Sequence, residues 1–346
     1  MPTLWNQPYT RSAVQRHVTD LRHLADIRSF ELSDGLERGV RALQVRNAAG
    51  LDFTILADRG MGLYDAQFRG VPLAWLSSVG VTHPAYGEPT GFGWLRTWPG
   101  GFLTPCGMTQ VGSPCNDNGE ELGIHGRVSN LAARQLKWGA DWHNDRYVLW
   151  AEGTLIETSV FGVHLVLTRR ISTTLDEAKL WIEDRIENRG MTPAPLMILQ
   201  HFNLGFPLAD VTARLILPAH TTVPRDDAAR PGFDHCLEFD EPIDGYDEQV
   251  FYHDLQADAN GKVEVRLINP AFNNGQGLGM AWRYPKAEYP ILTEWKMMRA
   301  GFYAIGVEPG NCHVEGRVKE RERGTLQMIA PQEVRTFNIE LEFFNL

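Results

Sequence analysis

The 346-residue chain has little cysteine, no excess of basic charge and no long apolar run. Its four cysteines include no C-x-x-C pair and no disulfide-framework spacing, which favours buried thiols in a reducing cytoplasm. The net charge of −10 argues against nucleic-acid partners and anionic membrane surfaces, because both attract basic proteins. No run approaches the ~18 apolar residues of a membrane span, and the first residues do not resemble a signal peptide. We therefore expect a cytoplasmic protein.

Metal and cofactor motifs are also absent. The eleven histidines show no H-x-H or H-E-x-x-H spacing, and no cysteine cluster accompanies them, so we expect no metal site. A G-x-S-x-G elbow, a Walker loop and a dinucleotide-binding fingerprint are missing as well, so no cofactor is expected. A hydrophobic fraction of 43% nevertheless provides ample material for a core. These features predict a globular protein whose chemistry rests on side chains alone.

Most of the chain shows strand-length segments separated by turn residues, as in antiparallel β-sandwiches. In the last strand, Phe337, Ile339, Leu341 and Phe343 alternate with polar residues, the period expected of a half-buried strand. Helical spacing is confined to residues 12–25, with Val14, Val18, Leu21 and Leu24 on one side. Further strands are predicted at residues 40–45, 51–57, 63–68, 73–76, 135–138, 147–154, 159–168, 179–188, 196–202, 214–217, 263–268, 279–284 and 303–307. We predict an all-β, mainly antiparallel fold with a few short helices, divided into an extension (residues 1–34) and a single sandwich domain (35–346).

One long region lacks a regular pattern. Residues 80–124 are rich in Gly, Pro and Trp, including Trp94 and Trp98. Irregular loops of more than ~15 residues are usually functional or disordered, and the aromatic content argues against disorder. We expect this region to form an ordered wall around a pocket.

The segment around His201 carries the first candidate site residues. A strand-like run ends in Gln200-His201-Phe202-Asn203, so His201 and Asn203 should point to one face and Phe202 to the other. Two polar groups beside an aromatic ring suit the floor of a site for a small polar ligand. The alternative is a structural histidine near apolar residues.

Three further segments hold candidate groups, each with a simpler alternative. In Ile305-Gly306-Val307-Glu308, an apolar strand delivers a carboxylate whose partial burial should raise its pKa toward that of a general base, unless Glu308 caps the turn or pairs with an arginine. His125 follows a polar loop and could instead donate to a backbone carbonyl. Asp247 lies in an acidic turn, where Asp is common for local reasons. Arg59 could form a surface ion pair with Asp58 or Asp65.

Together these segments resemble the aldose 1-epimerase (galactose mutarotase-like) superfamily from about residue 35 to the C-terminus. The similar segments are Pro193 to Leu204, Ile124-His125-Gly126, Gly245-Tyr246-Asp247 and Val307-Glu308-Pro309, in the same order as in that superfamily. The segments Asp58-Arg59-Gly60-Met61 and Thr104-Pro105-Cys106-Gly107 indicate an uncharacterised subgroup. The resemblance implies a galactose mutarotase-like β-sandwich, the supersandwich.

The resemblance also implies an activity and a set of roles. It implies an isomerase that interconverts the α and β anomers of a free aldose or sugar derivative, with Glu308 as base, His201 as acid and His125 as a second donor. Asp247 would accept hydrogen bonds from sugar hydroxyls, with Arg59, Arg127 and Asn203 as further binding candidates. Trp94 or Trp98 would stack on the sugar ring, unless these tryptophans serve only to pack the loop. The implied partner is a small carbohydrate, and the protein would be a monomer or a homodimer.

Two alternatives to this function stay open on sequence grounds. One is a carbohydrate-binding protein without turnover, and the other is an epimerase or lyase on a modified sugar, because one fold supports several activities. A phosphorylated substrate would call for a basic cluster near the pocket. The four basic residues after Glu308 alternate with glutamates, which favours a solvated strand–turn face instead; they are Arg317, Lys319, Arg321 and Arg323.

Overall fold

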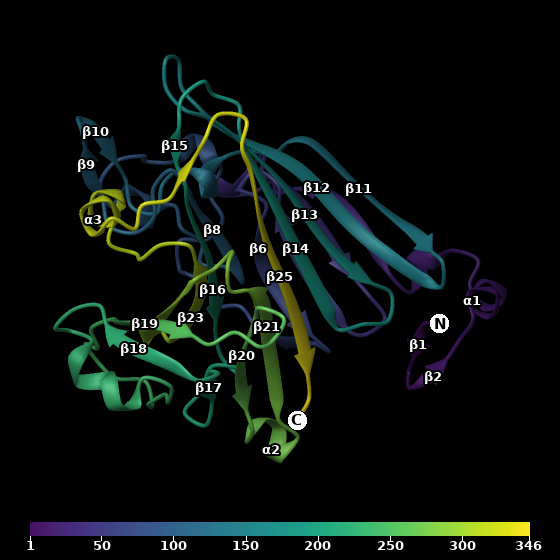
Figure 1. The fold of residues 1–346 in the computed structure, drawn as a ribbon. Helices are drawn as coiled ribbons and strands as arrows, with labels where there is room; N and C mark the ends of the chain where they lie inside the picture. The colour runs from purple at the N-terminus through teal and green to yellow at the C-terminus, as the bar shows by residue number, and fades with distance from the viewer.

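Two large antiparallel sheets make up most of the protein in a computed structural model, which describes residues 1–346 apart from the side chain of His220 (Figure 1). The larger sheet has the order β18-β19-β22-β23-β16-β8-β6-β5-β4-β3, with β7 paired to β6. Its strands are β3 (Asp26–Glu31), β4 (Arg41–Arg46), β5 (Leu51–Leu56), β6 (Gly62–Phe68), β7 (Val71–Pro72), β8 (Leu103–Met108), β16 (Met197–Leu204), β18 (His220–Pro224), β19 (Gln249–Leu255), β22 (Ile291–Met297) and β23 (Ala304–Gly310). This sheet carries the candidate site.

The second sheet has the order β11-β12-β13-β14-β25-β21-β20-β17. Its strands are β11 (Arg134–His143), β12 (Arg146–Thr158), β13 (His164–Thr174), β14 (Lys179–Asn188), β17 (Arg214–Ile216), β20 (Lys262–Asn269), β21 (Leu278–Pro285) and β25 (Val334–Phe344). The period-2 pattern predicted for the last strand is confirmed in β25, whose four alternating apolar side chains are buried. The all-β, mainly antiparallel fold is therefore confirmed.

Short elements decorate the two sheets. Three two-stranded pairs are formed by β1 (Thr3–Leu4) with β2 (Gln7–Pro8), β9 (Cys115–Asp117) with β10 (Glu120–Leu122), and β15 (Ala194–Pro195) with β24 (Met328–Ile329). The α-helices are α1 (Arg11–His17), α2 (Phe272–Gly275) and α3 (Arg317–Arg323). The 3-10 helices are η1 (Leu21–His23), η2 (Gly35–Glu37), η3 (Pro84–Tyr86), η4 (Gly93–Arg96), η5 (Val128–Asn130) and η6 (Arg230–His235). Across the described residues, none of these helices combines the length and apolar character that a membrane span requires.

Strand β16 separates two apolar clusters because its side chains alternate between the faces of the larger sheet. Phe202 belongs to the main core between the sheets, whereas Met197 and Leu199 belong to a second cluster on the outer face. That second cluster also contains Trp94, Trp98 and other aromatic residues. β16 is buried along its whole length, between β8 and β23. The outer face of the sheet around β16 is thus a covered surface rather than a solvated one.

The structure differs from the sequence-based expectations at several points. Residues 73–76, expected to form a strand, make only isolated bridges, and residues 159–163 form the turn between β12 and β13. The helix predicted over residues 12–25 is split into α1 and η1, because Asp20 caps a new turn through the backbone N–H of Arg22. Residues 103–108, expected to be irregular, form the buried strand β8 despite Pro105 and Gly107. The segment after Glu308, expected to be a solvated strand–turn face, forms helix α3, in which Arg317 and Glu320 are buried.

Strand pairing also crosses the predicted boundary between the extension and the sandwich. β3 lies within residues 1–34, and it pairs with β4 from Asp26 opposite Arg46 to Glu31 opposite Arg41. Only the β1–β2 hairpin, α1 and η1 lie outside this pairing, at the N-terminal end labelled in Figure 1.

Candidate active site

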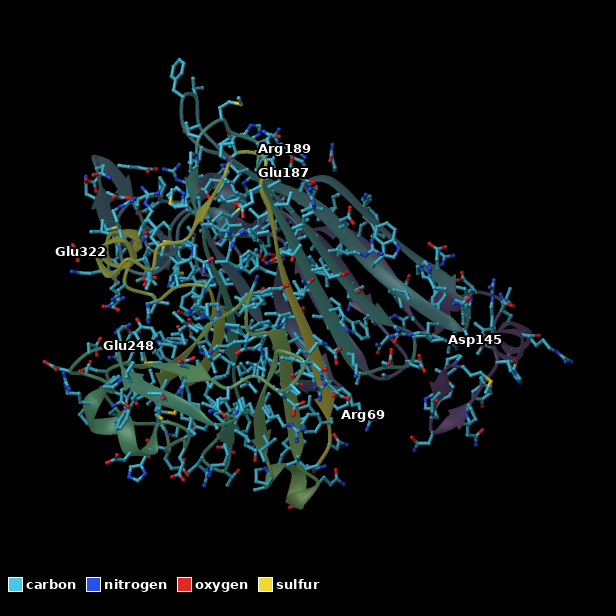
Figure 2. The ribbon with its side chains drawn as sticks, in the orientation of Figure 1. Arg69, Asp145, Glu187, Arg189, Glu248 and Glu322 are labelled. Carbon is cyan, nitrogen blue, oxygen red and sulfur yellow. The ribbon has the colours of Figure 1, made fainter. Side chains whose placement is uncertain are left out.

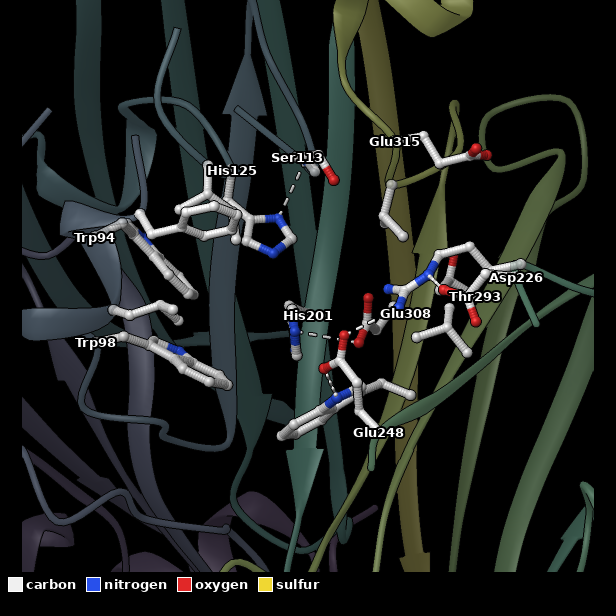
Figure 3. Close-up of a pocket in the computed structure, with 18 residues that line it drawn as sticks. Trp94, Trp98, Ser113, His125, His201, Asp226, Glu248, Thr293, Glu308 and Glu315 are labelled. Carbon is white, nitrogen blue, oxygen red and sulfur yellow. Dashed lines mark hydrogen bonds and ion pairs between the residues drawn. The ribbon is translucent and has the colours of Figure 1, made fainter. Parts of the chain in front are cut away.

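His201 and Glu308 face each other at the centre of the larger sheet. The pairs Leu199–Gly310 and Phe202–Val307 fix the antiparallel register of β16 and β23, which places His201 opposite Glu308. His201 Nε2 and Glu308 Oε1 are 3.2 Å apart, and both side chains are almost fully buried (Figure 3). Among the described residues, Glu308 Oε1 has no aligned hydrogen-bond donor, so it can accept one from a ligand.

Burial sets the protonation behaviour of this pair. Desolvation raises the pKa of Glu308 well above its usual value, in the direction predicted from the sequence. Burial also lowers the pKa of His201 well below its usual value, with a smaller contribution from His125. A carboxylate with a raised pKa is a stronger base, and an imidazolium with a lowered pKa is a stronger acid. The pair is therefore suited to exchange one proton with a bound molecule.

Space for Glu308 depends on the residue two positions before it. Side chains two apart on a strand share a face, and a Cβ at Gly306 would lie only 2.4 Å from Glu308 Oε1. The same Cβ would lie 2.8 Å from the Cβ of Trp295 on the neighbouring strand. A side chain at position 306 would thus displace the carboxylate, so the site requires a glycine there.

His125 supplies a second imidazole from the loop after β10. Its backbone is in the left-handed region, with a φ of 58°. Its N–H donates to the carbonyl of Gly112, and its Nδ1 accepts from the N–H of Gly112 at 3.4 Å. Burial lowers the pKa of His125 to about 4. The ring is therefore neutral near pH 7 and carries its hydrogen on Nε2, because Nδ1 is the acceptor.

Tryptophans form the wall beside the two histidines. Trp94 stacks on Trp98 with ring centroids 4.8 Å apart, and Trp98 meets the His201 ring edge-on at 5.3 Å. Trp94 and Trp98 are fixed through their indole N–H groups, by Ser129 and Thr104 respectively. Trp295 of β22 closes the other side of His201 at 5.7 Å. The prediction that residues 80–124 provide an ordered wall is confirmed, since Trp94, Trp98, Gly112, Ser113 and Ile124 all line the cavity.

The cavity itself measures about 470 Å³, within the range of about 300–1,000 Å³ that is usual for small-molecule sites. One side of it is lined by residues that flank β18 and β19, among them Arg225 and Glu248. Figure 2 shows Glu248 on the opposite side of the molecule from Asp145. The structure brings Glu308, His201, His125 and Trp94 together on the surface of the cavity. These are four of the eight site residues predicted from the sequence.

Four other residues predicted from the sequence lie elsewhere. The Asp247 side chain points to solvent, where it is 87% exposed and approaches Arg299 at 3.6 Å. Arg59 is buried and donates to the carbonyls of Ser129, Thr82 and Thr97, so it braces the loop wall from behind. Arg127 is exposed and does not line the cavity. Asn203 is buried beside His201, and its amide donates to the carbonyls of Gly101 and His201.

Sequence reasoning missed a group of partly exposed polar residues that line the cavity. Arg225 follows β18, and its guanidinium binds Asp226 at 2.7 Å and Glu248 at 3.0 Å. The other oxygen of Glu248 accepts a hydrogen bond from Trp295 Nε1 at 2.8 Å. Glu248 and Asp247 are adjacent, and alternation along the chain sends one into the cavity and the other to solvent. The acidic segment thus reaches the cavity through Glu248 and not through the predicted Asp247.

A buried network lies beneath His201, on the inner face of β16. Arg169 and Asp184 form a bidentate ion pair with distances of 2.7 and 2.6 Å, and both are 1% exposed. Gln200 bridges the pair, accepting from Arg169 at 3.0 Å and donating to Asp184 at 2.9 Å. This network ties β16 to the second sheet one residue before His201.

Cysteine, histidine and acidic side chains are the usual metal ligands in proteins. Within the described part of the chain, no three His, Cys, Asp or Glu side chains are grouped so that they could hold a metal ion. All four cysteines are free; Cys106, Cys236 and Cys312 are buried, as predicted, whereas Cys115 is partly exposed.

Comparisons with known proteins place the chain in a family and a fold. Residues 37–343 match the domain of unknown function DUF4432, and the chain belongs to that family. No curated protein sequence matches significantly. The structure resembles that of a “putative aldose 1-epimerase” from Klebsiella pneumoniae subsp. pneumoniae, with a TM-score of 0.87 at 23% identity over 95% of this chain and 85% of that chain. A galactose mutarotase-like protein from Clostridium acetobutylicum gives a TM-score of 0.64 at 13% identity, covering 94% and 100% of the two chains.

A galactose 1-epimerase from Lactobacillus acidophilus NCFM is similar over 93% of this chain and 99% of its own, with a TM-score of 0.54 at 13% identity. Identities this low establish the fold alone. The predicted galactose mutarotase-like β-sandwich is therefore confirmed, whereas activity has to be argued from the site.

Proposed function

We propose that this DUF4432 protein is an isomerase of the aldose 1-epimerase type, which interconverts the α and β anomers of a free aldose or sugar derivative without a cofactor. The observation that carries this proposal is the direct opposition of His201 and Glu308 at the floor of an aromatic-walled cavity. Binding a sugar would not by itself require an acid and a base in contact, but anomer exchange requires both.

The reaction follows from these groups in two halves. The pair shares one proton, and the reaction starts when that proton lies on His201. Glu308 then takes the proton of the C1 hydroxyl while His201 gives its proton to the ring oxygen, so the C1–O5 bond breaks and an open-chain aldehyde forms. The C1–C2 bond then rotates. In the reverse half, the O5 hydroxyl attacks the other face of C1, His201 recovers its proton from O5 and Glu308 returns one to O1. Protons and electrons balance, and both residues end as they began.

His125 and the tryptophans have supporting roles in this proposal. Neutral His125 can donate its Nε2–H toward the ring oxygen, because its Nδ1 is already engaged by Gly112. Trp94 and Trp98 offer apolar faces for the C–H face of a sugar ring, and Trp295 encloses the histidine from the other side. The remaining hydroxyls would meet polar groups near Arg225.

The first experiment is anomer exchange by NMR with a panel of aldoses, deoxy sugars and sugar acids. We expect the protein to accelerate α/β exchange for at least one member well beyond the uncatalysed rate. A sugar that saturates the protein without faster exchange would favour a carbohydrate-binding protein and contradict the proposed enzyme.

The pH dependence of exchange should reflect the shifted pKa values of the pair. Activity requires one proton shared between His201 and Glu308. The second proton is added only well below the usual pKa of histidine, because burial lowers the pKa of His201. The shared proton is lost only well above the usual pKa of glutamate, because burial raises that of Glu308. We expect a bell-shaped profile whose acid limb lies below pH ~6.5, and an acid limb at or above that value would contradict the assignment.

The two adjacent acidic residues provide a test of the binding assignment. Glu248→Gln should weaken sugar binding by about tenfold, the loss typical of one hydrogen bond to a charged group. Asp247→Asn should leave the dissociation constant within about twofold, because an exposed side chain outside the cavity contributes little. Titration of tryptophan fluorescence, to which Trp98 and Trp295 of the cavity wall contribute, measures both dissociation constants. The opposite ranking would restore Asp247 as the binding residue.

A further inference from the structure

Three partly exposed charged residues that line the cavity already pair with one another. Figure 3 shows Asp226 and Glu248 on the side of the cavity away from Trp94 and His125. Arg225 lies between the two carboxylates, with Nε on Asp226 and a terminal nitrogen on Glu248. Trp295 holds the second oxygen of Glu248. We call these three residues, Arg225, Asp226 and Glu248, the rim trio.

The electrostatic balance of the cavity disfavours an anionic ligand. Arg225 is the single Lys or Arg among the described residues that line it, whereas Asp226, Glu248 and Glu315 all contribute carboxylates. Glu315 is itself paired with Arg323, which lies outside the lining. The phosphate or carboxylate of a ligand would have to displace Asp226 or Glu248 from Arg225. The ligand anion would then lie beside the displaced carboxylate. Such like-charge contacts are a common means of rejecting a ligand.

An unsatisfied hydroxyl lies between the rim trio and the catalytic pair. Thr293 is opposite Glu308 in the register of β22 and β23, and it lines the same cavity. Its side-chain oxygen is buried, and it has no hydrogen-bond partner among the described residues, although Thr293 is only 1% exposed. Buried polar groups are normally paired. A threonine hydroxyl both donates and accepts, which matches a ligand hydroxyl better than an anion.

We propose that the rim trio and Thr293 form a hydroxyl-binding subsite that selects uncharged sugars over sugar acids and sugar phosphates. The identification of the ligand as a sugar rests on the proposed function. In this subsite the carboxylates of Asp226 and Glu248 accept hydrogen bonds from neighbouring hydroxyls of the ligand, and Arg225 donates from between them. The carboxylates also neutralise Arg225, which would otherwise attract an anion.

The test compares sugars that differ only in charge. Glucose, glucuronic acid and glucose 6-phosphate form one matched set, and galactose, galacturonic acid and galactose 6-phosphate form another. Dissociation constants are measured by quenching of tryptophan fluorescence. For at least one set, wild-type protein should bind the neutral sugar at least about tenfold more tightly than either anion. Equal or tighter binding of the anions would overturn the proposal.

The preference for the neutral sugar can be expressed as the ratio of the dissociation constant of the anion to that of the neutral sugar. Variants of the rim trio should change this ratio in opposite directions. Removing a negative charge with Asp226→Asn or Glu248→Gln should weaken binding of the neutral sugar and strengthen binding of the anion, so the ratio should fall by about tenfold or more. Removing the positive charge with Arg225→Met should raise the ratio. Equal losses for neutral and anionic sugars in all three variants would show a merely structural role and overturn the proposal.

A matched control comes from the residue next to Asp226. Asp227 is 93% exposed and pairs with Arg230, so Asp227→Asn changes the net charge equally without touching the cavity. It should leave the ratio unchanged, and a shift as large as that of Asp226→Asn would mean that overall charge sets the ratio. Circular dichroism checks that each variant is folded. If either Asp226→Asn or Glu248→Gln does not fold, the other serves as the test.

Failure of this proposal is distinguishable from failure of the proposed function. The charge preference is read from binding, which does not require turnover. A neutral-sugar preference without anomer exchange would support the subsite and contradict the enzyme. Exchange of a sugar acid or phosphate in preference to its neutral parent would support the enzyme and overturn the subsite.

Discussion

Glu308→Gln is expected to slow catalysed anomer exchange by about 10²–10⁴-fold, the contribution typical of one general acid–base group. Glutamine keeps the size of the side chain but cannot take the proton of the C1 hydroxyl. The substitution should not disturb folding, because burial already disfavours the charged form of Glu308. Sugar binding measured by tryptophan quenching should persist, since the aromatic wall is unchanged. NMR exchange spectroscopy measures the rate on the same samples.

The chain contains a matched control for this substitution. Glu294 is also fully buried, also has a raised pKa because of burial, and also contacts a histidine, with 3.0 Å between Glu294 Oε2 and His253 Nε2. It lies on β22 but does not line the cavity. Glu294→Gln should therefore affect stability rather than the exchange rate. If Glu308→Gln retained near-wild-type exchange, or if both variants lost it equally, Glu308 would not be the base.

The parts of the fold that could be predicted are those in which local pattern and burial agree. In β14, the buried residues Leu180, Ile182 and Ile186 alternate with more exposed ones, and the strand has the predicted bounds of residues 179–188. The same alternation placed His201 and Phe202 on opposite faces of β16. Glu308 was found because an apolar strand ends in a carboxylate, a pattern that does not depend on distant residues.

The parts that could not be predicted depend on contacts between distant segments. Strand β8 contains Pro105 and Gly107, which normally interrupt strands, and its pairing with β16 overrides that local preference. Arg225 follows a short strand with no motif around it, and only the fold brings it to Glu248, 23 residues later. Arg59 resembled a surface or binding residue, but it is surrounded by backbone carbonyls that come from three separate loop positions.

Arg169 and Asp184 form another feature that local pattern could not reveal in full. Asp184 occupies the apolar face of β14, where an isolated carboxylate would be costly to bury. Its cross-strand neighbour Arg169 on β13 compensates this charge, and Gln200 completes the network from the other sheet. The position of His201 is thus linked, through Gln200, to an ion pair that has no contact with the cavity.

Breaking this ion pair should produce the largest loss of stability that we predict. Asp184→Asn leaves the Arg169 guanidinium buried without a counter-charge, and such substitutions cost about 3–5 kcal/mol of unfolding free energy. Arg185→Met is the matched control, because Arg185 is adjacent on β14 but half exposed and paired with Glu187, so its loss should cost less than about 1 kcal/mol. The double variant Arg169→Met/Asp184→Leu removes both charges and should be more stable than Asp184→Asn, since no charge is left buried alone. Urea unfolding monitored by circular dichroism measures all three. A double variant no more stable than Asp184→Asn would show that the pair contributes through packing rather than through its charges.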